Sequence, residues 1–268
     1  MRKIFLFVAF AFTFLSSCST HEKVLKSKDL NYKLTEANKY YEAKKWYKAN
    51  EVYASLMPSF RGTKNYEELY YRYCYTFYNM EEYLSASYQF KNFIETFPKS
   101  SRADECEFMY ATCLYKLSPK PSLDQTNTYK AIEALQVYIN THPTSPNLTL
   151  ANNYIEDCRN KIEIKQANAA ELYYKIGQFK AATVAFKSLI QAHPDSEKLD
   201  YYQYMIMRSF YRYAENSVTE KQEERYAEAL NAFSDIKEYT PNSTYIKEAE
   251  KLSISAQNRI KQLRNEHN

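Results

Sequence analysis

Apolar residues recur along this chain with the spacing of one α-helix face. Five alanines mark the recurrence, and they are Ala49, Ala86, Ala131, Ala182 and Ala229. A large apolar residue lies four and seven positions after every one of them, and an aromatic residue lies three positions before four of them. Because these positions fall on one side of a helix, the pattern predicts five helices that each pack a small residue closely against a neighbour.

A proline and a serine mark where most of these helices end. The proline lies twelve positions after four of the alanines, and a serine follows it in Pro98–Ser100, Pro143–Ser145, Pro194–Ser196 and Pro241–Ser243. Proline cannot continue a helix, whereas a serine hydroxyl accepts hydrogen bonds from the free N–H groups that begin the next one. A second small residue precedes three of the alanines by twelve positions, at Ala37, Cys74 and Ala170. Each repeat is therefore predicted to be a pair of antiparallel helices.

Helix pairs of this kind resemble tetratricopeptide repeats. The expected fold is all-α, an α-solenoid of about five tetratricopeptide-like helix pairs plus a C-terminal capping helix from about Thr244 towards Leu263. The spacing between successive prolines exceeds the roughly 34 residues of that repeat, which predicts insertions at 118–127 and 217–225. Gly177 is expected at the turn within the fourth pair, where a helix end takes left-handed backbone angles.

The first residues of the chain have the pattern of a secretion signal. Arg2 and Lys3 precede an uncharged run from Ile4 to Phe14, which Leu15, Ser16, Ser17 and Cys18 follow. A basic start and a short apolar run are typical of a signal peptide and too short for a stable membrane span. The small residues before Cys18 resemble the lipobox of bacterial lipoproteins. An alternative is an ordinary cleaved signal in which the cysteine is incidental.

The lipobox resemblance implies how the mature chain begins. Residues 1–17 would be removed, and Cys18 would carry a covalent N-terminal lipid, with no other cofactor expected. Residues 18–29 would form a lipidated tether, and residues 30–268 the repeat domain. Ser19 follows the cysteine in place of an aspartate, which by the same resemblance favours the outer membrane. We therefore expect a protein that is lipid-anchored on the periplasmic face of the cell outer membrane.

Composition and motifs give little support to catalysis. Without Arg2 and Lys3 the formal charge falls from +4 to +2, which is too weak to indicate a nucleic-acid partner. The sequence has only 2 glycines, which argues against phosphate-binding loops, and its 4 histidines lie far apart. We expect no enzyme activity and no metal site. Four cysteines, at 74, 106, 113 and 158, are expected to be buried free thiols.

Tyrosines suggest a binding surface. On the first helix of the second repeat, Tyr71, Tyr75 and Tyr78 fall beside the predicted packing face, and Tyr41 has the equivalent position in the first repeat. Tyrosine offers a rigid apolar ring with a polar tip and is enriched where proteins bind one another. These four residues are predicted to line a substrate-binding groove. The alternative is that they only thicken a glycine-poor core.

The combination of a lipoprotein signal with five repeats resembles BamD, the lipoprotein family of the outer-membrane β-barrel assembly machine. Residues 40–49 resemble the family's opening repeat, and residues 83–98, with the run 93–100, resemble its second. The resemblance implies a non-catalytic scaffold with two protein partners. Its N-terminal repeats would bind unfolded outer-membrane β-barrel proteins, here through the four tyrosines. Its C-terminal repeats would dock on a BamA-type outer-membrane barrel with periplasmic repeat domains.

For that docking contact the resemblance points to Arg212, which with Tyr211 matches a Tyr-Arg pair in the family's last repeat. An arginine guanidinium can bind a partner carboxylate through two parallel hydrogen bonds. Two other functions stay open at this point. One is another envelope scaffold, similar to the Tol–Pal-associated coordinator of cell-wall synthesis. The other is a SusD-like glycan-binding lipoprotein, against which the single tryptophan, Trp46, speaks.

Overall fold

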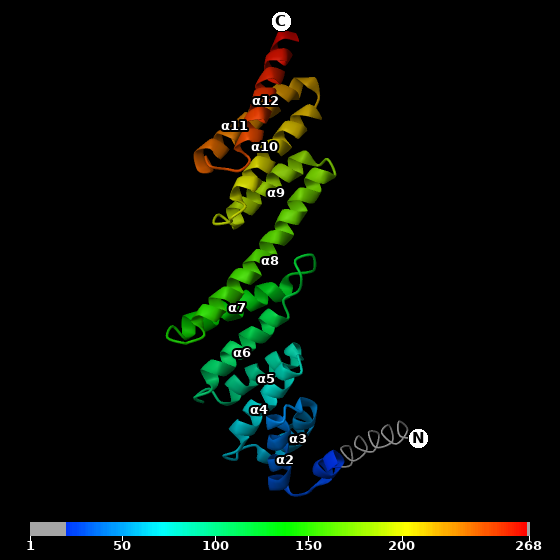
Figure 1. Cartoon of the computed structure of the whole chain (residues 1–268), viewed down its shortest axis with the longest axis vertical. Helices are drawn as coiled ribbons and strands as arrows, with labels where there is room; N and C mark the ends of the chain where they lie inside the picture. The colour runs from blue at the N-terminus through cyan, green and yellow to red at the C-terminus, as the bar shows by residue number, and fades with distance from the viewer. Residues whose placement is uncertain (1–19, 267–268) are drawn as a thin grey trace, which may run out of the picture. The chain divides into compact units, whose positions relative to one another are not determined.

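A computed structural model describes residues 20–266 of the chain (Figure 1). These residues form α-helices joined by turns, and no strand occurs among them. Two compact units are present, residues 1–158 and 159–268, with the boundary inside one long helix. The repeat domain that we expected over residues 30–268 is therefore divided into two units.

The first unit is built from consecutive helix hairpins. It contains α2 (Leu30–Glu42), α3 (Trp46–Phe60), α4 (Tyr66–Asn79), α5 (Tyr83–Thr96), α6 (Ala103–Lys116), α7 (Thr126–Thr141) and the start of α8 (Leu148–Lys175). The second unit contains the rest of α8, α9 (Phe179–Ala192), α10 (Leu199–Glu215), α11 (Thr219–Tyr239) and α12 (Ile246–Glu266). Helices α2 to α11 make five successive pairs and α12 follows them as the cap, so the predicted all-α solenoid is confirmed.

The five reference alanines are fully buried between the helices. All of Ala49, Ala86, Ala131, Ala182 and Ala229 have an exposed fraction of 0%. Their large neighbours are buried with them; Tyr53, Phe90 and Phe186, four residues after three of the alanines, are also at 0%. The spacing in the sequence therefore predicted the core positions correctly.

The turn within a pair uses left-handed backbone at one repeat position. Gly177 has φ +80°, and Lys44 and Glu81, at the equivalent positions of the first two pairs, have φ 56° and 61°. In each case the next residue donates its N–H back to a carbonyl five residues earlier, with N–O distances of 2.8 to 3.0 Å. This closure is the Schellman end of a helix, for which glycine is the least strained residue. The sequence predicted it at Gly177 alone.

The recurring serines lie two residues before the N-cap position at which we predicted them. The helices that follow begin at Ala103, Leu148, Leu199 and Ile246, three residues after each serine. Each serine hydroxyl accepts the N–H two residues ahead, as in Arg102 N to Ser100 Oγ at 3.0 Å. The serine thus forms a tight turn before the helix and is not its N-cap residue. Three of them also donate to a carboxylate of the preceding repeat: Ser100 to Glu67, Ser196 to Glu163 and Ser243 to Asp200.

The segment expected to be a free tether begins to pack at the first described residues. Residues 20–26 are helical, and Val24 has an exposed fraction of 0% within the core of the first unit. His21 Nε2 lies 2.7 Å from a Glu51 carboxylate oxygen, and Lys33 Nζ donates to the carbonyl of Leu25 at 3.1 Å. The interpretation of 18–29 as a tether is therefore wrong for its helical part. The signal segment and Cys18 lie outside the described residues.

Candidate protein-binding surfaces

Tyr71, Tyr75 and Tyr78 form a row of half-buried rings along α4. The ring centroids of Tyr71 and Tyr75 are 4.9 Å apart, and those of Tyr75 and Tyr78 are 6.4 Å apart. All three also pack against the core of the first unit. The structure therefore brings these predicted residues together, and it gives them a part in core packing as well.

The hydroxyl groups of this row are already engaged. Tyr71 and Tyr75 both donate to the carboxylate of Glu105 on α6, with an O–O distance of 2.8 Å for Tyr71. Burial, together with this carboxylate, raises the pKa of both phenols well above the usual value of 10.0. Both phenols therefore stay protonated as donors to Glu105 at neutral pH. What they offer to a partner is the exposed part of their rings.

Charged side chains connect Tyr41 of α2 to the tyrosine row of α4. The guanidinium of Arg72 lies 5.2 Å from the Tyr41 ring centroid, and that of Arg102 lies 4.2 Å from the Tyr71 ring centroid. Glu68 bridges the two arginines, with N–O distances of 2.6 Å to Arg72 and 2.5 Å to Arg102. We call the surface made by the four tyrosines and these three charged residues the tyrosine face. It is supplied by the first helices of three successive pairs.

Arg212 lies on a different surface, in the second unit. Its guanidinium is 5.5 Å from the Phe179 ring centroid, and one nitrogen is 2.8 Å from a Glu215 oxygen. The side chain is 48% exposed. Because a guanidinium has five N–H donors and Glu215 takes one of them, Arg212 keeps donors for a partner.

A second arginine accompanies Arg212. Arg208 lies one helical turn earlier on α10, with its guanidinium 5.0 Å from the Tyr174 ring centroid. Both arginines line an open pocket of about 640 Å³ to which α12 contributes Lys251 and Glu248. We call this the arginine pocket. The sequence analysis missed Arg208, although its spacing of four from Arg212 places the two on one helix face.

The remaining candidate groups have structural contacts. His142 Nε2 is 2.6 Å from a Glu107 oxygen, and His193 Nε2 is 2.8 Å from the Gln166 side-chain oxygen. Both histidines thus bind the preceding helix from the same repeat position. The prediction of buried free thiols is confirmed for Cys74, Cys106, Cys113 and Cys158. Within residues 20–266, no group of three or more histidine, cysteine, aspartate or glutamate side chains is placed to hold a metal ion.

Consecutive helix pairs that present aromatic and arginine side chains to solvent define a protein-binding scaffold of the α-solenoid class. The family comparison is more specific. A family model described as outer membrane lipoprotein, YfiO, matches residues 27–183 and 162–265. The chain therefore belongs to this family, the BamD family of outer membrane lipoproteins.

Two solved structures of TPR domains are also similar to this chain. The TPR2AB domain of yeast Sti1 in its complex with pHSP90 is 16% identical, with a TM-score of 0.41, covering 85% of this chain and 98% of that one. The TPR domain of P58(IPK) is 14% identical, also with a TM-score of 0.41, covering 87% of this chain and 66% of that one. None of the curated proteins compared with the chain matches it. Among the described residues, no helix combines the length and apolar character that crossing a membrane requires.

Proposed function

We propose that this protein is a non-catalytic scaffold of the outer-membrane β-barrel assembly machine. Its first unit would bind unfolded outer-membrane β-barrel proteins, and its second unit would dock on a BamA-type barrel through that barrel's periplasmic domains. The observation that carries the proposal is the family match, which in two overlapping ranges covers residues 27–265. It favours this function over a cell-wall coordinator and over a SusD-like glycan-binding lipoprotein.

The tyrosine face suits a client that must be released again. A barrel strand without its neighbours exposes aromatic side chains and unpaired backbone groups, which aggregate readily. Tyr41 and Tyr71 can cover such aromatic side chains with their rings, while Arg72 and Arg102 add a positive charge beside each ring. The Tyr71 hydroxyl is already bound to Glu105, and Arg72 and Arg102 are already paired with Glu68. Binding through ring surfaces alone is therefore weak, which permits transfer to a barrel that offers full strand pairing.

The arginine pocket suits a permanent contact. Arg208 and Arg212 each lie against an aromatic ring, which restricts their side chains before a partner arrives. A carboxylate of the docked barrel would find two guanidinium groups one helical turn apart. The membrane attachment in this proposal is the covalent lipid on Cys18, which would hold the scaffold on the periplasmic face. No cofactor takes part.

Crossed variants test the two assignments together. A labelled peptide with the sequence of a barrel's C-terminal strand is titrated against the purified lipoprotein in mild detergent, and co-purification of the large barrel is measured in parallel. Tyr71→Leu keeps an apolar side chain but removes the aromatic ring, and it should weaken peptide binding about fivefold, the ~1 kcal/mol that one aromatic contact contributes. Arg212→Glu should leave the peptide affinity unchanged and lose the barrel.

Matched controls separate binding from folding. Tyr239→Leu removes a tyrosine that is 65% exposed elsewhere, and Arg264→Glu removes an exposed arginine that pairs with Glu223 on another surface. Both should behave as wild type in both assays. If Tyr71→Leu and Tyr239→Leu bind the peptide equally well, the tyrosine face is not the client site. A barrel that co-purifies fully with Arg212→Glu contradicts the docking assignment.

A further inference from the structure

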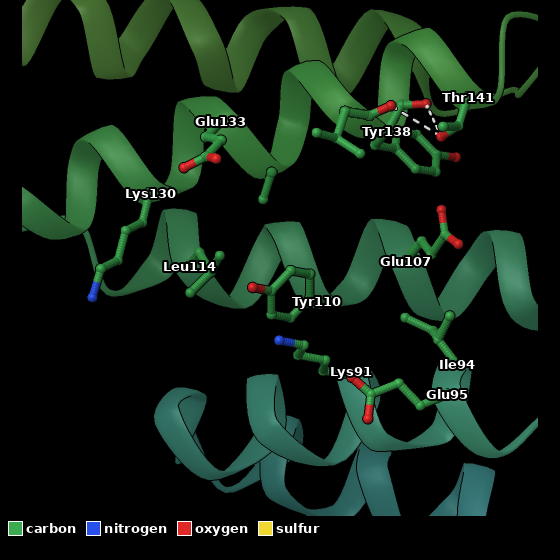
Figure 2. Close-up of a pocket in the computed structure, with 12 residues that line it drawn as sticks. Lys91, Ile94, Glu95, Glu107, Tyr110, Leu114, Lys130, Glu133, Tyr138 and Thr141 are labelled. Atoms are coloured by element: carbon green, nitrogen blue, oxygen red, sulfur yellow. Dashed lines mark hydrogen bonds between the residues drawn. The ribbon is translucent and has the colours of Figure 1, made fainter.

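The first unit has a groove on another side, between α5 and α7. One hollow of about 470 Å³ is lined by Ile94 of α5, Tyr110 and Leu114 of α6, and Val137 of α7 (Figure 2). A second hollow of about 660 Å³ extends it along α5 to Leu84 and shares four lining residues with it: Lys91, Tyr110, Leu114 and Lys130. The two hollows form one continuous trough with α6 as its floor, which we call the α5–α7 groove.

Large apolar side chains on the walls of this groove are open to solvent. Leu84 is 71% exposed, Tyr88 is 63% exposed and Val137 is 55% exposed. Ile94 and Leu114 are half-buried between them. A contiguous apolar strip of this kind on a protein surface marks a contact with another molecule.

The fold itself does not require this strip, as the second unit shows. Counted from the reference alanines, Lys180 replaces Leu84 and Asp235 replaces Val137 in the second unit. Counted from the recurring serines, Phe210 replaces Leu114, and the Lys187 ammonium covers it at 4.9 Å from the ring centroid. The same helix arrangement therefore forms with charged residues at these two wall positions and a covered floor. Only part of the apolar strip is particular to the first unit, because Val184, which is 59% exposed, takes the place of Tyr88.

Charges are distributed unevenly along the groove. Lys91 and Lys130 line both hollows and so lie where the two meet, and neither forms an ion pair with any described residue. Three carboxylates line the first hollow alone, those of Glu95, Glu107 and Glu133. In Figure 2, Glu107 and Glu95 lie towards the opposite end from Lys130. An occupant that complements the groove carries an acidic side chain near its middle and a basic side chain at the end over Glu95, because Glu107 is already bound by His142.

The walls also decide the conformation of the occupant. Every wall is a helix, whose backbone N–H and C=O groups bond within the helix, so no strand edge is offered. An extended segment would find no strand edge to pair with here, whereas an α-helix satisfies its backbone groups internally. From Leu84 to Glu95 the wall is about 17 Å long at 1.5 Å per residue, which matches about three turns of helix.

We propose that the α5–α7 groove is a docking site for an amphipathic α-helix of a partner protein. That helix presents an apolar stripe with the spacing i, i+4, i+7, an acidic residue facing Lys91 and Lys130, and a basic residue facing Glu95. This contact is separate from the client and barrel contacts proposed above, because it uses a different side of the first unit and a helix in place of a strand.

Site-specific photo-crosslinking in intact cells tests the proposal on the full lipoprotein. A photoreactive benzophenone side chain is placed at Val137 in the groove, or at Val184 as the matched control, which is 59% exposed on α9. We expect about tenfold more crosslinked adduct at 137 than at 184, the preference of a specific contact over chance encounters. The partner segment, identified by mass spectrometry, should show the helical apolar stripe with its acidic residue.

A second substitution checks that the adduct depends on the groove. Leu84→Lys, which copies the residue that the second unit has at this position, should reduce the adduct at 137 about tenfold. Because Leu84 is largely exposed, the melting temperature should not change. Equal adduct at 137 and 184, an adduct that survives Leu84→Lys, or a partner segment that is an extended barrel strand or a second copy of this chain would each overturn the proposal.

Discussion

The hydrogen bonds between Ser196, Glu163 and Tyr202 give the sharpest stability prediction. Ser196 Oγ and the Tyr202 hydroxyl both donate to the same Glu163 oxygen, each at 2.6 Å, and Ser196 Oγ also accepts the Lys198 N–H at 3.0 Å. All four residues lie in the second unit. Replacement of Ser196 by alanine removes one bond to a charged carboxylate and the acceptor of the turn that precedes α10.

The expected cost follows from those two losses. A hydrogen bond to a charged group contributes about 1.5–3 kcal/mol when buried. Glu163 is only half-buried, so screening by solvent reduces its bond to about 1 kcal/mol. The exposed turn bond adds about 0.5 kcal/mol. Ser196→Ala should therefore lower the free energy of unfolding by about 1–2 kcal/mol, whereas Ser234→Ala, at an exposed serine within α11, should change it by less than about 0.5 kcal/mol.

The same contacts predict how the effect depends on pH. Burial raises the pKa of Glu163, but the bonds from Ser196 and Tyr202 outweigh it and the pKa lies below 4.5. A carboxyl with a lowered folded pKa stabilises the protein above its unfolded pKa, and this contribution is lost as the pH falls through the folded value. The cost of Ser196→Ala should thus be full at pH 6 and shrink below pH 4.5.

Urea unfolding followed by circular dichroism, with hydrogen exchange to locate the change, measures both quantities. Exchange protection should fall in α9 and α10. A cost below about 0.3 kcal/mol at pH 6, or a cost that stays constant down to pH 3, would refute this explanation of the recurring serine.

Three further predictions concern single residues. Gly177→Ala should destabilise the protein by about 1 kcal/mol, because an added Cβ meets no atom within 4 Å and only the left-handed φ of +80° opposes it; a loss below about 0.3 kcal/mol in urea unfolding would contradict this. Ala86→Leu should cost about 1–3 kcal/mol by overpacking a site that is 0% exposed, and an unchanged melting temperature would mean that the helices separate easily there. Cys18→Ala should release the protein from membranes in cell fractionation, since the proposed lipid anchor is lost; full recovery in the outer membrane would refute lipidation.

Helix packing and helix ends could be predicted from the sequence because they depend on nearby residues. The alanines with their apolar neighbours gave the core register, and the prolines gave the helix ends. The predicted role of the serines as N-cap residues was wrong. The capping preference alone does not show that the hydroxyl reaches a carboxylate such as Glu163 more than thirty residues away. The turns at Lys44 and Glu81 carry no glycine and so gave no signal.

The candidate binding surfaces were predictable only within one helix. The row of tyrosines on α4 follows from helical spacing, as does the Glu68–Arg72 pair. The contacts of Glu105 with Tyr71 and of Arg102 with Glu68 join different helices, and their register depends on how the pairs stack. The packed helix at residues 20–26 was missed because the polar residues around Val24 suggested a tether.

The most direct test of the proposed scaffold role is the composition of the native complex. The lipoprotein is affinity-purified from mildly solubilised outer membrane, and the proteins that accompany it are identified and quantified by mass spectrometry. The account predicts stoichiometric recovery of a large barrel with periplasmic repeat domains, together with smaller amounts of other barrel proteins as clients. Recovery of cell-wall enzymes or glycan transporters in its place would contradict the assembly role, although the helix-pair fold would stand.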